Sequence, residues 1–241
     1  MATRKLKSKV SDDNDNYNID YEGVLSRFMP GGVFSNFDNL YVMNNPGGGS
    51  CLFYSVVQGI HSQFIQGYDD SLEFVIDQEE FIKDLRMEMA EELNKAIDPL
   101  DENSKTWYNV LSRGTLEEKS KDMKEFQLKS LQNVLRSGAT PDLESQIFIE
   151  MMSKMFDVDI YIYNSDVGDI AILDEELYYE GRLSIFLLLQ SEHYQLILHK
   201  DFNDHYSLNF ETSHPLIEKI KLRTKEMGKN RSKTLIRKRF T

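Results

Sequence analysis

The chain has 241 residues and a mass of 28.1 kDa, with 40% hydrophobic and 28% charged residues. This composition is typical of a globular protein that buries a core. No run of about 18 apolar residues occurs, which excludes a transmembrane helix, and the basic start has no apolar stretch after it, so we expect no secretory signal. The single cysteine, Cys51, excludes an internal disulfide and a Cys-rich zinc site. We therefore expect a reducing compartment, the cytoplasm or the nucleus.

Charge is distributed unevenly along the chain. The net charge is −12, but residues 219–241 hold ten Lys or Arg and one acid, Glu226, which gives this segment +9. Subtracting +9 from −12 leaves −21 on the other 218 residues. So acidic a body repels nucleic acid and anionic membranes. The basic segment indicates a tail that binds nucleic acid or another polyanion, or a nuclear address; the alternative is a solvated end that neutralises the body.

The N-terminal part of the sequence predicts a polar arm, one strand and then helices. Residues 1–19 predict a disordered arm, and the folded domain is expected to span about residues 20–215. A strand is expected at 38–43, and residues 46–50 (PGGGS) form the strongest loop signal in the chain. The spacing of apolar residues predicts helices at 52–60, 79–97, 115–136 and 140–155.

The C-terminal part changes to the alternating pattern of strands. Strands are expected at 157–164, 171–173, 183–189 and 194–199, with residues 190–193 connecting the last two as a hairpin. Helices followed by strands, without a βαβ repeat, predict an α+β fold. Residues 216–241 predict a basic tail. The helical spacing of Leu216, Ile217, Ile220 and Leu222 would let the start of that tail dock on the domain.

Cys51 occupies the place in the chain where a nucleophile is best supported. It follows Gly48, Gly49 and Ser50 directly and begins a predicted helix. Glycines let backbone N–H groups turn toward a ligand, where they can stabilise an oxyanion. The helix N-terminus favours the thiolate over the thiol. The alternative is that Cys51 is a small buried apolar residue, the usual role of a lone cysteine.

A thiolate nucleophile needs a base, and histidine is the usual one. The chain has five histidines, His61, His193, His199, His205 and His214. His61 lies ten residues along the Cys51 helix, about 15 Å away, and His205 and His214 lie in polar, turn-like sequence. His193 stands between two apolar strands that would hold it rigidly. It is the preferred base, although an isolated histidine there is more often an ordinary turn residue.

Three blocks of sequence resemble the ovarian tumour (OTU) family of cysteine proteases. Residues 48–56 (GGSCLFYSV) are similar to the family's nucleophile motif, which typically reads Asp-Gly-Asn-Cys-Leu-Phe-Arg/Tyr-Ala/Ser-Val. Residues 185–189 (IFLLL) and 192–194 (EHY) resemble the strand and His-Tyr motif of the catalytic histidine. Residues 144–163 resemble the helix and strand that precede it. The blocks occur in the family's order over residues 40–200.

The resemblance implies a papain-like fold, with helices packed on a small, mostly antiparallel sheet. It also implies hydrolysis of (iso)peptide bonds to ubiquitin or a ubiquitin-like modifier, with that modifier as partner. Cys51 would be the nucleophile, His193 the base, and Gly48, Gly49 and Ser50 the oxyanion loop. No metal and no organic cofactor is implied.

Two positions depart from the family pattern. The family commonly has Asp three residues before the cysteine, where this chain has Gly48, and many members have Asp or Asn two residues after the histidine, where it has Gln195. Residues i and i+2 of a strand share a face, so the amide oxygen of Gln195 could orient the imidazole. Asp38 is the alternative orienting acid. These departures favour a second hypothesis, a catalytically degraded OTU-like domain that acts as a binding or structural protein, with a basic tail that anchors it to nucleic acid or another acidic partner.

Overall fold

The computed structural model describes residues 24–66, 76–96, 106, 108, 121–139, 145–171 and 181–239. The predicted arm at 1–19 lies outside the described residues. Within them, no helix is long and apolar enough to cross a membrane.

The described strands form one seven-stranded sheet in the order β1-β2-β6-β5-β3-β4, with β7 paired to β6. Strands β3 and β5 are parallel, and every other described pair is antiparallel. The strands are β1 (Leu25–Phe28), β2 (Leu40–Met43), β3 (Val158–Asn164), β4 (Asp169–Ala171), β5 (Leu183–Gln190), β6 (His193–Lys200) and β7 (Tyr206–Ser207). The predicted strands at 38–43, 157–164, 183–189 and 194–199 are confirmed within about two residues at each end.

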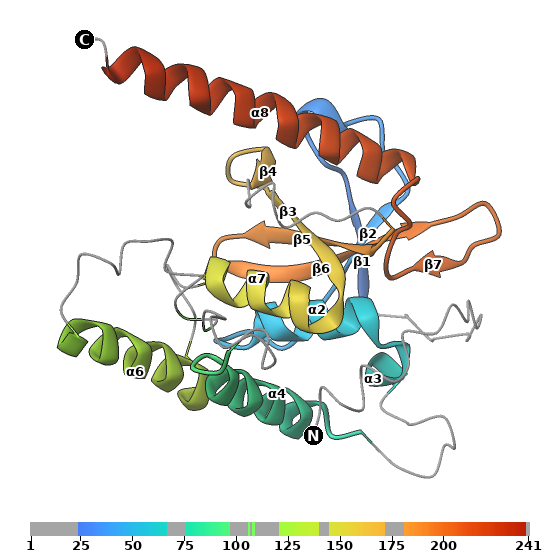
Figure 1. The fold of residues 1–241 in the computed structure, drawn as a ribbon. Helices are drawn as coiled ribbons and strands as arrows, with labels where there is room; N and C mark the ends of the chain where they lie inside the picture. The colour runs from blue at the N-terminus through green and yellow to red at the C-terminus, as the bar shows by residue number, and fades with distance from the viewer. Residues whose placement is uncertain are drawn as a thin grey trace.

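Helices cover both faces of this sheet (Figure 1). They are α2 (Cys51–Ile60), α3 (Ser62–Gln66), α4 (Gln78–Glu92), α6 (Lys121–Ser137), α7 (Ser145–Phe156) and α8 (Pro215–Arg239), with a short 3-10 turn, η1 (Gly32–Phe34). In Figure 1, α8 lies above the sheet, α2 and α7 lie below it, and α4 and α6 form a further layer beneath them. Helices packed on a mostly antiparallel sheet confirm the predicted α+β fold.

Alternation along the strands divides the core in two. Ile185 and Leu187 of β5 belong to the large cluster shared with α2, α4, α6 and α7. Phe186 and Leu188 point the other way, into a smaller cluster shared with α8. This is the period-two pattern expected of a sheet buried on both faces.

Helix α2 lies unusually close to the sheet because of Gly59. A Cβ atom added at Gly59 would come within 2.8 Å of Ile185 Cγ2 on β5 and 3.1 Å of Leu196 Cδ1 on β6. Only glycine lets the last turn of the helix approach the sheet this closely. The contact fixes α2, and with it the position of Cys51 at its other end.

The segment expected to be a basic tail is a helix whose first turns pack on the sheet. Leu216, Ile217 and Ile220 are fully buried, which confirms the predicted docking for three of the four apolar residues, whereas Leu222 is 56% exposed. Arg223 donates hydrogen bonds to Asp169 of β4, and these bonds lower the pKa of Asp169 below its usual value. The division of the chain at residue 215 stays a prediction, but the residues after it join the core.

Because only one side of α8 packs on the sheet, truncating two apolar residues of this helix should affect the free energy of unfolding very differently. Ile217→Ala should lower the free energy of unfolding by about 2–5 kcal/mol, because it leaves a cavity in the smaller cluster. Leu222→Ala, on the exposed side, should change it by no more than about 0.5 kcal/mol. Urea unfolding followed by circular dichroism measures both. Equal effects of the two substitutions would mean that α8 does not pack as described.

Candidate active site

Cys51 is the first residue of α2 and is 3% exposed. The loop before it contains Gly48 at φ +84°, a backbone conformation that favours glycine. Ser50, the N-cap residue, makes no side-chain cap hydrogen bond, and the first turn of α2 contains no acidic residue. No side-chain charge within this turn therefore offsets the partial positive charge of the helix N-terminus beside the sulfur.

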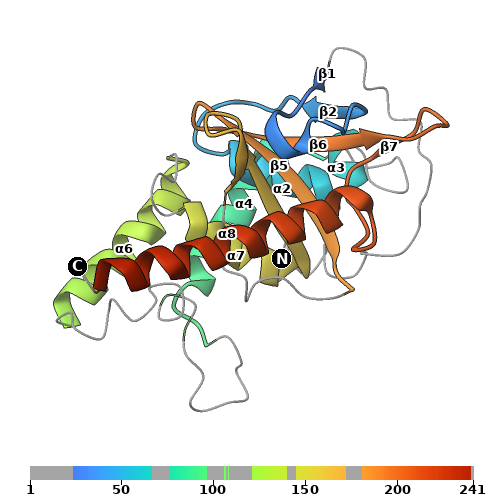
Figure 2. The same cartoon turned by 90° about the horizontal axis from the view of Figure 1, so that it is seen from above.

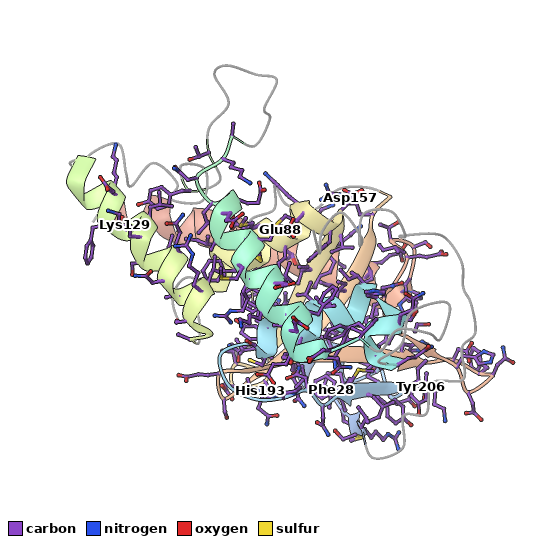
Figure 3. The ribbon with its side chains drawn as sticks, turned by 90° about the horizontal axis from the view of Figure 1, so that it is seen from below. Phe28, Glu88, Lys129, Asp157, His193 and Tyr206 are labelled. Atoms are coloured by element: carbon purple, nitrogen blue, oxygen red, sulfur yellow. The ribbon has the colours of Figure 1, made fainter. Side chains whose placement is uncertain are left out.

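The sulfur of Cys51 lies against the first residues of β6. The backbone N–H of Tyr194 points at Cys51 Sγ, with 3.5 Å between nitrogen and sulfur. Tyr194 directly follows His193, which begins β6 and pairs with Gln190 at the end of β5. His193 is half-buried and lies at the rim of the molecule in Figure 3. The structure thus places the backbone of the residue that follows the predicted base against the predicted nucleophile.

Asn45, which the sequence analysis missed, ties these two elements together. Its Nδ2 group donates to Ser55 Oγ of α2 at 2.8 Å and to the carbonyl of Tyr194 at 3.0 Å. Ser55 Oγ in turn donates to the carbonyl of Cys51 at 2.9 Å. Among the described residues, Asn45 Oδ1 is buried without a hydrogen-bond partner, so the NH₂ group alone holds this side chain.

Gln195 lies two residues after His193 on the same strand, as predicted. Its Nε2 group donates to Asn44 Oδ1 at 2.8 Å. This bond leaves the Gln195 Oε1 atom free to act as an acceptor on the side-chain amide. In the described part of the chain no hydrogen bond to the His193 imidazole is formed; such bonds often form only when substrate binds.

The structure does not bring Asp38 to His193. Leu40 of β2 pairs with His199 of β6, so Asp38 lies at the far end of β6. Six residues of strand separate His193 from His199, about 20 Å at roughly 3.3 Å per residue. Burial lowers the pKa of His199, and the charges of Asp201 and Asp38 oppose this effect. Asp38 therefore acts on His199, and its prediction as the orienting acid is corrected.

The other histidines lie away from Cys51. His61 follows the last residue of α2. His205 lies 3.7 Å from Asp201 in an exposed turn. His214 packs against His199 and Phe210, with ring centroids 5.0 Å apart in both pairs.

A second residue missed by the sequence analysis, Arg86 of α4, contacts the loop before Cys51. Its Nη1 group donates to the carbonyl of Gly49 at 2.6 Å and to Ser50 Oγ at 3.2 Å. The sequence did contain a signal, because Arg86 falls on the apolar face of its helix between Ile82 and Met89. A charged residue at such a position is expected to have specific partners.

Within the described residues, no group of three or more His, Cys, Asp or Glu side chains is placed to hold a metal ion.

The chain resembles solved structures but matches no known sequence family. No protein-family model matches the chain, and no curated protein matches it. Among the similar solved structures, one of an ovarian tumour (OTU) domain in complex with ubiquitin is similar over 88% of this chain and 95% of that chain, at 17% sequence identity and a TM-score of 0.42.

The bridging role of Asn45 predicts a loss of stability when its amide is removed. Asn45→Ala should lower the free energy of unfolding by about 1–3 kcal/mol, because it leaves the Tyr194 carbonyl without this partner. Asn44→Ala is the matched control: Asn44 is exposed, and its loss should cost no more than about 0.5 kcal/mol. Urea unfolding compares them. An Asn45→Ala protein as stable as Asn44→Ala would contradict the bridge.

Proposed function

We propose that this protein is an OTU-like thiol protease that hydrolyses (iso)peptide bonds to ubiquitin or a ubiquitin-like modifier. The observation that carries the proposal is the 3.5 Å contact between Cys51 Sγ and the N–H of Tyr194. It joins the only thiol of the chain, at a helix N-terminus, to the residue beside His193. Thiolate and imidazole placed together at the end of a strand are the elements of cysteine-protease chemistry.

In this mechanism the Cys51 thiolate attacks the carbonyl carbon of the scissile bond, and the electron pair of the C=O bond moves to oxygen. Backbone N–H groups of Cys51 and of the loop at Gly48–Ser50 stabilise the oxyanion. The N–H of Cys51 donates to the Gly48 carbonyl across 3.4 Å, a long bond that an oxyanion can replace. The oxyanion then collapses and the C–N bond breaks. Protonated His193 gives its proton to the leaving amine, and the acyl group remains on Cys51 as a thioester. His193 then removes a proton from water, and the hydroxide hydrolyses the thioester and regenerates the thiolate.

Gln195 is the residue proposed to orient His193. Asn44 fixes the amide by accepting from Nε2, so Oε1 can accept from an imidazole N–H and hold the ring in one tautomer. A neutral amide stabilises an imidazolium less than a carboxylate does. Gln195 is therefore suited to fix the orientation of the His193 ring rather than to stabilise the charge of its imidazolium.

The proposal predicts distinct results for two histidines and the cysteine. Cys51→Ala should abolish hydrolysis of ubiquitin chains and capture by a ubiquitin C-terminal electrophilic probe, because no other thiol is present. His193→Ala should lower turnover by about 10²-fold or more, the usual scale for a general acid–base group. Turnover of a fluorogenic ubiquitin substrate measures both.

His205→Ala serves as the control, since His205 is exposed in a turn away from Cys51. It should retain turnover within about twofold, as expected of a surface substitution. Full activity of Cys51→Ala would refute the protease. A loss from His205→Ala equal to that from His193→Ala would move the site to another part of the sheet.

The alternative function is a catalytically degraded OTU-like domain that binds a partner through its basic C-terminal segment. Gly48 and Gln195 at the two departing positions favour it, as does the course of α8. The C-terminal half of α8 projects past the sheet in both Figure 1 and Figure 2. Residues 228–241 contain six Lys or Arg and no acid, a composition that attracts polyanions such as nucleic acid.

Truncation after Met227 tests this alternative without removing the packed start of α8. The shortened protein should bind a nucleic-acid duplex more weakly than the full chain, and binding by the full chain should fall steeply between about 50 and 200 mM salt. Cleavage of free ubiquitin chains should stay unchanged. Fluorescence anisotropy measures binding. Salt-insensitive binding by the full chain, or no binding, would remove the proposed anchoring role.

A further inference from the structure

Arg86 is a buried cation that uses all of its hydrogen-bond donors. It is 2% exposed. Its Nε group donates to the carbonyl of Leu135 at 2.8 Å, and its Nη2 group donates to Val134 and Ala139 at 2.6 and 2.8 Å. With the Nη1 bonds to Gly49 and Ser50, these make five hydrogen bonds, one for each N–H of a guanidinium.

The partners of Arg86 lie on two separate elements. Three are carbonyls at or just after the end of α6, where a helix carries partial negative charge and unpaired carbonyl groups. The other two lie in the loop that precedes Cys51. Arg86 thus ties the loop to the α4–α6 layer, while its guanidinium also stacks over Phe53 of α2 at 4.5 Å from the ring centre.

The bond to Gly49 controls which way the loop presents its N–H groups. In a trans peptide, the C=O of one residue and the N–H of the next point in opposite directions. When Arg86 holds the Gly49 carbonyl, the N–H of Ser50 is turned to the other side. Consecutive glycines at 47–49 would otherwise rotate easily, so this loop needs an external hold to keep its donors aligned.

The charge of Arg86 is compensated by backbone and hydroxyl oxygens. Among the described residues Arg86 has no acidic hydrogen-bond partner, and a buried cation is costly unless compensated. Burial lowers the pKa of Arg86 to about 10, and the charge of Cys51 opposes that effect. Four carbonyl oxygens and Ser50 Oγ supply the compensation.

We propose that Arg86 is a positioning residue that holds the oxyanion loop in its donor-presenting conformation. Its catalytic part rests on the function proposed above, whereas its effect on the loop does not. Arg86 touches no reacting atom, because it acts through Gly49 and Ser50.

Amide hydrogen exchange in the loop gives a readout that requires no substrate. Arg86→Met keeps an unbranched side chain but removes the hydrogen bonds to the Gly49 carbonyl and to Ser50 Oγ. Amide exchange in residues 47–51 should therefore speed up by about tenfold, because the loop opens more often when it is not held.

Arg86→Lys separates the charge from the guanidinium geometry. A lysine keeps the positive charge but has three donors and no planar fork, so it cannot hold both the loop and the end of α6. Amide hydrogen exchange in residues 47–51 should speed up by about tenfold although the charge is kept, and kcat should fall more than KM rises.

Arg182→Met is the matched control. Arg182 has an 18% exposed side chain paired with Asp157 at 2.6 Å, and it precedes β5 at the opposite end from Gln190 and His193. This variant should leave the amide exchange in residues 47–51 unchanged.

Wild-type loop exchange in folded Arg86→Met or Arg86→Lys would overturn the proposal. Failure of both variants to fold would reduce Arg86 to a residue of the core and also overturn it. If the wild-type protein does not hydrolyse ubiquitin chains but the two variants show the faster loop exchange, the proposed protease is refuted and the role of Arg86 stands.

Discussion

The site depends on the place where the β2–β6 ladder stops. The last described pair is Met43 with Leu196, so the first residues of β6 extend past the end of β2. Buried backbone groups must find partners, and those of Tyr194 find them in side chains: the N–H donates to Cys51 Sγ and the carbonyl accepts from Asn45. The thiol thus takes the position of a missing strand residue. This arrangement holds the thiol against the backbone of the residue that follows His193.

Much of this arrangement follows from local pattern. The apolar stripe after the glycine loop predicts α2, and the alternation on either side of residues 190–193 predicts β5 and β6. Together they place a thiol at a helix start and a histidine at a strand start. The contact between the two, however, requires the close approach of α2 to the sheet at Gly59. A glycine inside a helical pattern indicates such an approach only when the opposing strand is known.

The residues that sequence reasoning missed act through the backbone of distant segments. Asn45 binds a carbonyl 149 positions away, and Arg86 binds carbonyls 37 and 48 positions away. Backbone carbonyls exist at every position, so no residue type marks these partners. The prediction that Asp38 orients His193 was wrong for a related reason. The sequence places Asp38 just before β2 but does not give the register of β2 with β6, and the antiparallel pairing puts Asp38 at the end of β6 near His199. The docking of the start of α8, in contrast, could be predicted, because the helical spacing of Leu216, Ile217 and Ile220 is a local pattern.

The electrostatics of the site are consistent with its two departures from the family pattern. Neither Gly48 nor Gln195 brings a negative charge to the neighbourhood of Cys51, in a body that is otherwise strongly acidic. Charges on the surface are screened by water and salt, whereas Arg86 and the α2 N-terminus act from the interior, where screening is weak. Neither departing position therefore adds a carboxylate that would oppose these two positive sources at the sulfur. In the proposed mechanism Gln195, held by Asn44, orients the imidazole without adding charge to it.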